Sequence, residues 1–125
     1  MDSSIDLNGG QLAGADLAGN DLSDADLSNS KMFGMRSGGI TGTQPALPGY
    51  KLINGYLVGP GSDLTGADFT GADLSNVVLS IATLTGADLT DATMTGVKYN
   101  STICPNGTNS NARSPQSCAG QGGGL

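Results

Sequence analysis

A large apolar residue recurs at every fifth position in two stretches of this chain, from Leu7 to Met32 and from Leu64 to Tyr99. A period of five fits neither the period of two of a flat strand nor the period of about 3.6 of an α-helix. Each five-residue unit is therefore expected to be a short extended segment followed by a corner. The fourteen residues of this core column are Leu7, Leu12, Leu17, Leu22, Leu27, Met32, Leu64, Phe69, Leu74, Leu79, Leu84, Leu89, Met94 and Tyr99.

The neighbours of the core column indicate where each side chain points. Two residues earlier the chain has a small or apolar residue in most units, and positions two apart share one face of an extended segment. The residue between them is expected to face solvent, and it is Asp at positions 6, 16, 21, 26, 63, 68, 73 and 88. Two residues after the core column, twelve of the fourteen units have Gly, Asn or Asp, which tolerate a left-handed corner. We therefore expect a solenoid with a narrow packed interior.

The units ADLAG, ADLSN, ADFTG and ADLTD resemble the pentapeptide-repeat family, and the resemblance covers about half of the chain. It implies an all-β fold, a right-handed quadrilateral β-helix with four units per coil. The large and small columns would lie inside this β-helix. Residues twenty apart would then stack, with Leu64 on Leu84 and Phe69 on Leu89.

The two repeat blocks are out of phase, because Met32 and Leu64 are 32 positions apart, which is not a multiple of five. Within the interruption, KLI-NG-YLV predicts a β-hairpin, since Asn54-Gly55 suits a type I′ turn between apolar strands. We expect this hairpin arm to leave the solenoid near Arg36, to return near Pro60-Gly61 and to lie against the coils. The expected organisation is one domain: repeat block 1–34, hairpin insertion 35–61, repeat block 62–101, and closing segment 102–125.

Two apolar residues of the second block break its local rules. Val78 stands in the outward column that is mostly Asp, and Ile81 stands at a corner where nearly every other unit has Gly, Asn or Asp. Our hypothesis is that the arm or a second subunit covers them. Tyr50, Tyr56 and Leu57 of the arm complete the set of residues expected to contact a partner.

The closing segment contains the two cysteines of the chain, Cys104 and Cys118. A disulfide is the favoured interpretation, worth about 3 kcal/mol for a loop of this size. A two-cysteine metal site and two inert thiols are the alternatives. The bond would cap the last coil, whose edge is otherwise open. The CPNGTNS…C arrangement resembles the closing segment of exported bacterial pentapeptide-repeat proteins.

The chain is acidic, with 11 Asp+Glu, 5 Lys+Arg, no His and a net charge of −6. This balance excludes a basic nucleic-acid binder, and the lack of His removes histidine-based catalysis and His metal sites. No apolar run approaches the length of about 18 residues needed for a membrane span. We expect no catalytic residues, no cofactor and no metal site.

The segment MDSSIDL has none of the features of a signal peptide, so we expect a mature form or a piece of a longer exported protein.

The Asp columns have three interpretations. They keep the solenoid soluble, which is the favoured one; they bind calcium; or they imitate nucleic acid. Some members of the family resemble B-DNA and protect DNA gyrase, but about three and a half coils at about 4.8 Å each give a rod of only about 17 Å. A ladder of threonines (Thr65, Thr70, Thr85, Thr90 and Thr95) follows the core column. It suits ice binding, although β-propensity explains it equally well.

The sequence thus predicts a non-catalytic structural or protein-interaction module of an exported bacterial pentapeptide-repeat protein. We expect it outside the cytosol, in the periplasm or the extracellular space. Its partner would be an unidentified protein, with self-association as a second option and without nucleic acid. The alternative function is an acidic DNA mimic that binds a type II topoisomerase such as gyrase.

Overall fold

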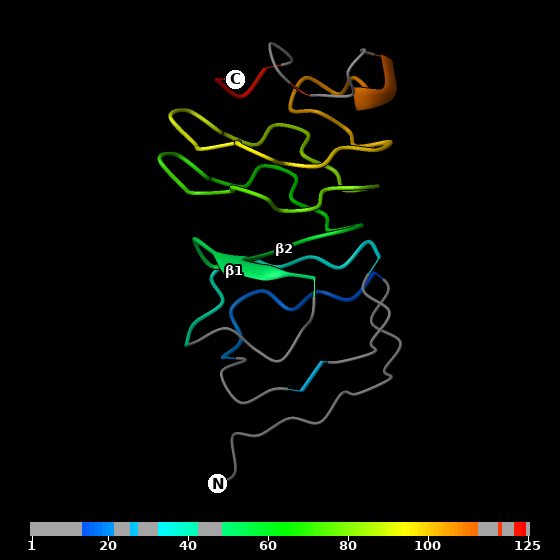
Figure 1. The fold of residues 1–125 in the computed structure, drawn as a ribbon. Coiled ribbons are helices and arrows are strands. Elements are labelled where there is room, and N and C mark those ends of the chain that lie inside the picture. The colour runs from blue at the N-terminus through cyan, green and yellow to red at the C-terminus, as the bar shows by residue number, and fades with distance from the viewer. Residues whose placement is uncertain are drawn as a thin grey trace, which may run out of the picture.

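The repeat units wind into stacked coils in which residues twenty apart lie side by side (Figure 1). The computed structural model describes residues 14–21, 26–27, 33–42, 49–112, 118 and 122–124. In the second repeat block, parallel bridges connect Asp63 with Thr83, Asp68 with Asp88, Asp73 with Thr93, and Val78 with Lys98. The green and yellow coils of Figure 1 are joined by these bridges, and they follow one another in sequence order.

The corners of the second repeat block from Leu64 to Val97 are tight turns, each closed by one backbone hydrogen bond. The N–H of Ala67 donates to the carbonyl of Leu64 over 3.0 Å. Gly66, the third residue of this turn, has a φ of 71°, which is the left-handed conformation that a type II turn requires. The extended part is tied to the next coil, since the N–H of Leu64 donates to the carbonyl of Thr83 over 2.8 Å. The period of five therefore follows from three extended residues and a two-residue corner.

The core column and the small column fill the interior. The fully buried members of the core column are Leu27, Leu64, Phe69, Leu74, Leu79, Leu84 and Leu89. The small column contributes the buried residues Ala67, Ala72, Val77, Ala82 and Ala87. Leu17, Met94 and Tyr99 are half-buried. Leu7, Leu12, Leu22 and Met32 lie outside the described residues.

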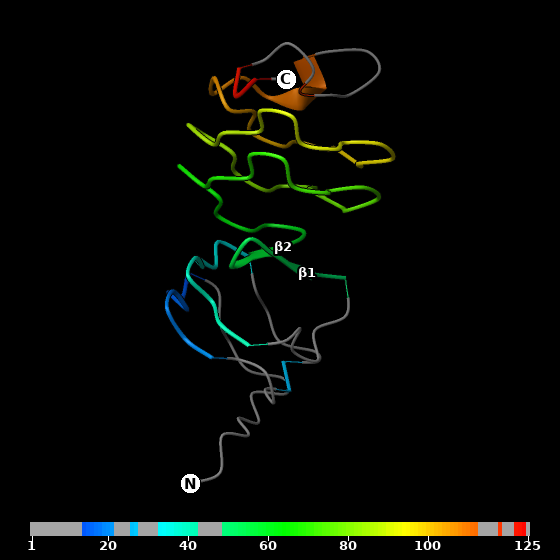
Figure 2. The same cartoon turned by 90° about the vertical axis from the view of Figure 1, so that its left-hand side faces the viewer.

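The expected hairpin is present. Strand β1 (Lys51–Ile53) pairs antiparallel with β2 (Tyr56–Val58). Both residues between the strands have positive φ, 50° at Asn54 and 83° at Gly55, which is what a type I′ turn demands. In both views the hairpin lies between the cyan and the green coils, as part of the stack (Figure 2).

The hairpin separates two apolar clusters. Leu57 is fully buried in one cluster together with Met35 and Ile40. Its neighbours Tyr56 and Val58 belong to the other cluster, which the second repeat block forms. Successive residues of a strand point to opposite faces, so β2 supplies one core from each of its faces. The hairpin is therefore a septum across the interior of the solenoid.

In the coil next to the septum, a large residue stands in the small column and a small residue stands in the core column. Arg36 takes part in parallel bridges to the coils on both sides, which places Met35 in the small column and Ser37 in the core column. Met35 is fully buried, and the Ser37 hydroxyl oxygen accepts a hydrogen bond from the N–H of Leu57 over 2.9 Å. The small Ser37 therefore leaves room for β2 and satisfies one of its donors, while Met35 fills the core from the other column.

The insertion begins later than the sequence boundary 35–61 indicates. Arg36 and Thr41 are both bridged in parallel to residues twenty positions earlier, Asp16 and Asp21. Residues 36–41 therefore continue the ladder. Arg36 is also bridged to Asp63, which comes 27 positions later instead of 20. The coil that contains the hairpin is thus seven residues longer than the others, and the chain leaves the five-residue spacing after Thr41 and not near Arg36.

After the last coil the chain reverses and covers part of the open edge. Ile103 forms an antiparallel bridge with Asn109, and the N–H of Cys104 donates to the carbonyl of Thr108 over 2.7 Å. The short 3-10 helix η1 (Ser110–Ala112) follows this reversal. A strand that pairs with the final coil in this way removes unpaired backbone groups from the edge.

Gly123 covers a second side of the same edge. The N–H of Leu89 donates to the carbonyl of Gly123 over 2.7 Å. A Cβ atom at position 123 would lie 2.7 Å from the carbonyl oxygen of Ala87, so only glycine allows this close approach. Gly123 is therefore part of the cap.

The septum leads to a stability prediction. Replacement of Leu57 by Ala should lower the free energy of unfolding by about 2–5 kcal/mol, because the cavity would lie in the fully buried junction with Met35 and Ile40. The matched variant Leu52→Ala, at a half-buried position of the same hairpin, should lower it by less than half of that amount. Urea unfolding at neutral pH measures both values, and equal losses would contradict the septum.

Candidate functional site

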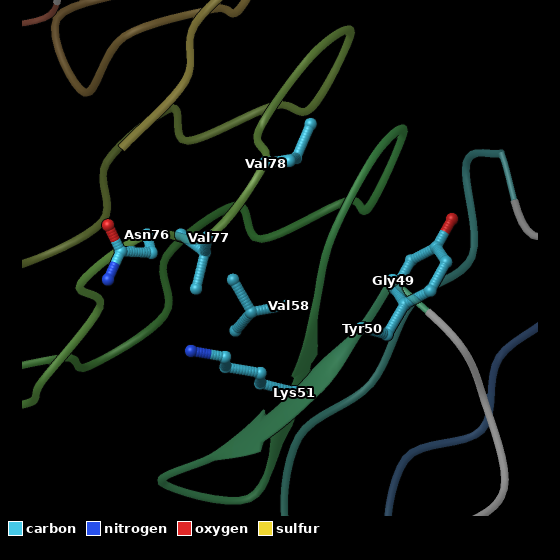
Figure 3. A pocket seen from close by; sticks show the side chains of 7 residues that line it. All are labelled: Gly49, Tyr50, Lys51, Val58, Asn76, Val77 and Val78. Carbon is cyan, nitrogen blue, oxygen red and sulfur yellow. The ribbon is translucent and has the colours of Figure 1, made fainter. Parts of the chain in front are cut away.

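The hairpin and the second repeat block enclose a groove of about 190 Å³ (Figure 3). It is lined by Gly49, Tyr50, Lys51, Val58, Asn76, Val77 and Val78. Tyr50 and Val78, two of the residues expected to contact a partner, both line it. The structure thus brings the arm next to Val78, as the sequence suggested, but leaves an open space between them.

Tyr50 forms a rigid part of the groove wall. Its hydroxyl donates a hydrogen bond to the carbonyl of Pro60 over 2.5 Å. The ring packs so closely on Gly59 that a Cβ there would lie 2.3 Å from the Tyr50 Cδ2 atom. Burial raises the pKa of the Tyr50 phenol above its ordinary value of 10.0, so the side chain is neutral at physiological pH.

Lys51 supplies a positive charge beside the apolar part of the groove. Its Nζ atom donates to the carbonyl of Ser75 over 3.2 Å, which holds the amine next to the corner that carries Asn76. Lys98 lies one coil further along the stack, in a parallel bridge with Val78. The groove therefore combines apolar side chains with the amine of Lys51, and the amine of Lys98 belongs to the neighbouring coil.

Two other residues expected to contact a partner belong to the interior instead. Leu57 has an exposed fraction of 0%, so the prediction that it contacts a partner is wrong. Its burial follows from β2 lying across the solenoid. Tyr56 is half-buried, and its ring centroid lies 5.1 Å from that of Phe69. Tyr56 therefore packs mainly on the core.

Ile81 lies apart from the groove, on an exposed corner. Its side chain is 59% exposed and its φ is 65°, a conformation that is unfavourable for a β-branched residue. Phe33, which is 55% exposed, lies on the same corner two coils away. Its ring covers Gly61, since a Cβ at Gly61 would lie 2.0 Å from the Phe33 Cδ1 atom. Gly61 lies between the two positions in the stack, since the N–H of Gly34 donates to its carbonyl and its own N–H donates to the carbonyl of Ser80, and both side chains are exposed.

The outward Asp residues have a structural role that the sequence analysis missed. A carboxylate oxygen of Asp68 accepts a hydrogen bond from the backbone N–H of Thr70 over 3.0 Å. Asp63 accepts one from the N–H of Thr65 over 3.1 Å and a second from its hydroxyl over 2.6 Å. Such side-chain bonds to the backbone two residues ahead fix the start of each corner. The threonine hydroxyl of Thr65 is therefore bound within the chain.

The same bonds alter the acidity of two carboxyls. The Ser75 hydroxyl, followed by its backbone N–H, donates to Asp73 and lowers the pKa of that carboxyl below its ordinary value of 3.8. Thr90 lowers the pKa of Asp88 in the same way. Both carboxylates are exposed, and both are ionised at neutral pH.

The disulfide between Cys104 and Cys118 is present, with the Cα atoms 5.3 Å apart. Cys104 occupies the position of the core column in the final coil, directly after Ile103, whose carbonyl accepts a hydrogen bond from Leu84. Both cysteines are fully buried. Buried Thr102 donates its hydroxyl to the carbonyl of Leu79 over 2.7 Å, so the polar atom next to the disulfide is satisfied.

In the described part of the chain, no three His, Cys, Asp or Glu residues come together as metal ligands would. The same residues contain no helix that is long and apolar enough to cross a membrane.

The carboxyl–hydroxyl pairs lead to a prediction about acid stability. Because the folded pKa of Asp73 and of Asp88 lies below the ordinary value, the stabilisation is present above about pH 4 and is lost as the pH falls through the folded values. The melting temperature should therefore fall between about pH 5 and pH 2. The fall should be smaller in Asp73→Asn/Asp88→Asn, which keeps acceptors but does not titrate. In Ser75→Ala/Thr90→Ala, the fall in melting temperature should lie between that of the unaltered chain and that of the Asn variant. Equal falls in all three proteins would contradict this explanation.

Comparison with known proteins places these features in a family. The family model for pentapeptide repeats matches residues 3–34 and 61–98 with eight copies. A search of curated proteins found no match.

One similar solved structure is HetL, described as a pentapeptide repeat protein involved in heterocyst differentiation regulation, from the cyanobacterium Nostoc sp. strain PCC 7120. The two chains are 21% identical with a TM-score of 0.39, over 85% of this chain and 42% of HetL. This chain therefore spans less than half of the length of HetL. Because the family model matches more than half of its residues, this chain belongs to the pentapeptide-repeat family.

Proposed function

We propose that this chain is a non-catalytic structural or protein-interaction module of an exported bacterial pentapeptide-repeat protein. Members of the family are usually non-catalytic. The observation that carries the proposal is Ile81, an exposed β-branched residue at a corner position that favours Gly or Asn. A residue with an unfavourable backbone conformation and no compensating burial indicates a role outside the folding of the chain. Contact with a partner protein supplies such a role.

The proposed architecture is a right-handed quadrilateral β-helix over residues 1–41 and 62–101, interrupted by the hairpin and closed by residues 102–125. The twenty-residue spacing of the parallel bridges supports it. Ile81 and Phe33 lie on one corner of this rod and would meet the partner together. The partner is a protein, either another component or a second copy of the chain.

Ile81 gives a direct test of the trade-off between stability and binding. Ile81→Asn should raise the free energy of unfolding by about 1 kcal/mol, since Asn tolerates the left-handed conformation at lower cost. The reverse change at an equivalent corner, Asn76→Ile, should lower it by about 1–2 kcal/mol, because Asn76 has a φ of 64°. Urea unfolding of the two variants measures both changes.

The same position tests the interaction itself. A photoreactive side chain at position 81 should yield discrete cross-linked protein species in the producing cell. The same side chain at exposed Thr93, on another side of the coil, should yield none. Absence of discrete species from position 81, or identical species from both positions, would contradict an interaction through this corner.

Export is supported by the disulfide, because thiols are kept reduced in the cytosol of most organisms. Protein taken from its native compartment should gain no mass on treatment with iodoacetamide before reduction. After reduction it should gain the mass of two carbamidomethyl groups, one each on Cys104 and Cys118. Two thiols that react before reduction would contradict export and would return the protein to the cytosol.

The alternative function is an acidic DNA mimic that binds gyrase. The stacked, exposed carboxylates of Asp68 and Asp88 favour it. The short rod and the amines of Lys51 and Lys98 on one side speak against it, since DNA presents negative charge on all sides. Inhibition of gyrase supercoiling at sub-micromolar protein would establish the mimic in place of the interaction module.

A further inference from the structure

One face of the solenoid lacks the acidic residues that mark the others. Each bridged column of outward residues in the described part of the chain contains Asp, except the column of Val78 and Lys98. Lys51 lies beside this column, since its Nζ atom reaches the carbonyl of Ser75 at the preceding corner. We call Lys51, Val78 and Lys98 the lysine face.

The lysine face is positive in a chain of net charge −6. Among the residues that the structure describes, the ion pair found is the one between Arg36 and Asp63, at 3.9 Å on another side of the coil. In that part of the chain Lys51 and Lys98 form no ion pair within 4.0 Å, and the nearby carboxylate of Asp73, whose pKa a side-chain hydrogen bond and the charge of Lys51 help to lower, lies on the neighbouring face. A charge distribution of this kind attracts negatively charged groups to one face only.

The groove provides an apolar anchor point on the same face. Val78 lines it with a partly exposed side chain, Val58 and Val77 lie beneath it with exposed fractions of 1% and 4%, and Lys51 lies at the same site (Figure 3). Its volume of about 190 Å³ can be compared with an apolar cavity of about 150 Å³ that accommodates benzene. The groove therefore has room for one branched aliphatic or aromatic side chain.

We propose that the groove binds an acidic, extended segment of a partner protein. One apolar side chain of the segment packs on the partly exposed Val78 and Tyr50, and carboxylates on either side of it pair with Lys51 and Lys98. This inference rests on the proposed function and names the chemical class of the partner. A second copy of the chain in a symmetric arrangement would oppose lysine to lysine on this face, which is unfavourable.

The two kinds of contact have different tasks. Burial of the apolar side chain supplies affinity, in proportion to the area removed from water. The exposed ion pairs contribute little affinity but determine which segments bind and how quickly they associate. Binding should therefore be specific for acidic segments and should weaken as salt is added.

The test uses the full, disulfide-bonded chain and a fluorescein-labelled peptide, Gly-Asp-Asp-Leu-Asp-Asp-Gly. Fluorescence anisotropy should show binding that weakens at least about threefold between low and physiological salt. Two control peptides, one with Asn in place of every Asp and one with Ser in place of Leu, should each bind at least about threefold more weakly.

Variants of the protein locate the binding. Lys51→Ala/Lys98→Ala should weaken binding of the acidic peptide by about three- to tenfold, and Val78→Asp by at least about tenfold. Arg36→Ala removes one positive charge from another side of the coil, as each of the two lysine substitutions does from the lysine face, so it is the control for net charge and should bind as the unaltered chain does. Circular dichroism and the melting temperature establish that each variant is folded.

Several outcomes would overturn the inference. These are equal binding of the acidic and Asn peptides, unchanged binding by the lysine and Val78→Asp variants, or equal losses in Arg36→Ala. Equally strong binding of anionic phospholipid vesicles, in competition with the peptide, would assign the face to a lipid surface instead. Cross-linking from position 81 is independent of the groove, so a partner captured there while the acidic peptide fails would remove this inference and leave the proposed function in place.

Discussion

The coils that the structure describes depend on a backbone conformation that few residues adopt easily. The third residue of each corner turn needs a positive φ, and glycine provides it at Gly66, Gly71 and Gly86. Asp residues stabilise the same corners from the other end, since their carboxylates accept hydrogen bonds from the chain two residues ahead. The apolar interior is thin, so regular corners are what allow one leucine to stack on another along the axis.

The septum changes this uniform arrangement at one place. It needs a buried Leu57, a small Ser37 that accepts its N–H, and a Met35 that fills the space from the neighbouring column. None of these residues fits the repeat rule by itself, and together they preserve a filled core. The groove is a product of the same arrangement, because it forms where the hairpin meets the regular coil at Val77 and Val78.

Most of the fold could be predicted from the sequence, because a period of five over fourteen units has few physical explanations. The hairpin at Asn54-Gly55 and the disulfide were also predictable, since turn chemistry and paired cysteines are local signals. Met35 and Ile40 were missed, although they too are five residues apart, because they occupy the small column and not the core column. The roles of Asp68 and Gly123 were missed for another reason. Alternation shows only that Asp68 points outward, and the contact of Gly123 with Leu89 links residues 34 positions apart.

The seven additional residues of the hairpin coil have a further consequence. Arg36 and Asp63 remain neighbours in the ladder despite the longer connection between them, so the sides of the rod stay aligned through the break in sequence phase. At this one coil, additional residues therefore do not move the following residues to another side of the rod. A connection of different length or shape could replace the hairpin while the columns before and after it kept their orientation. A regular rod of this type can therefore acquire a new recognition site by exchanging a single loop, and the rest of its surface is unaltered.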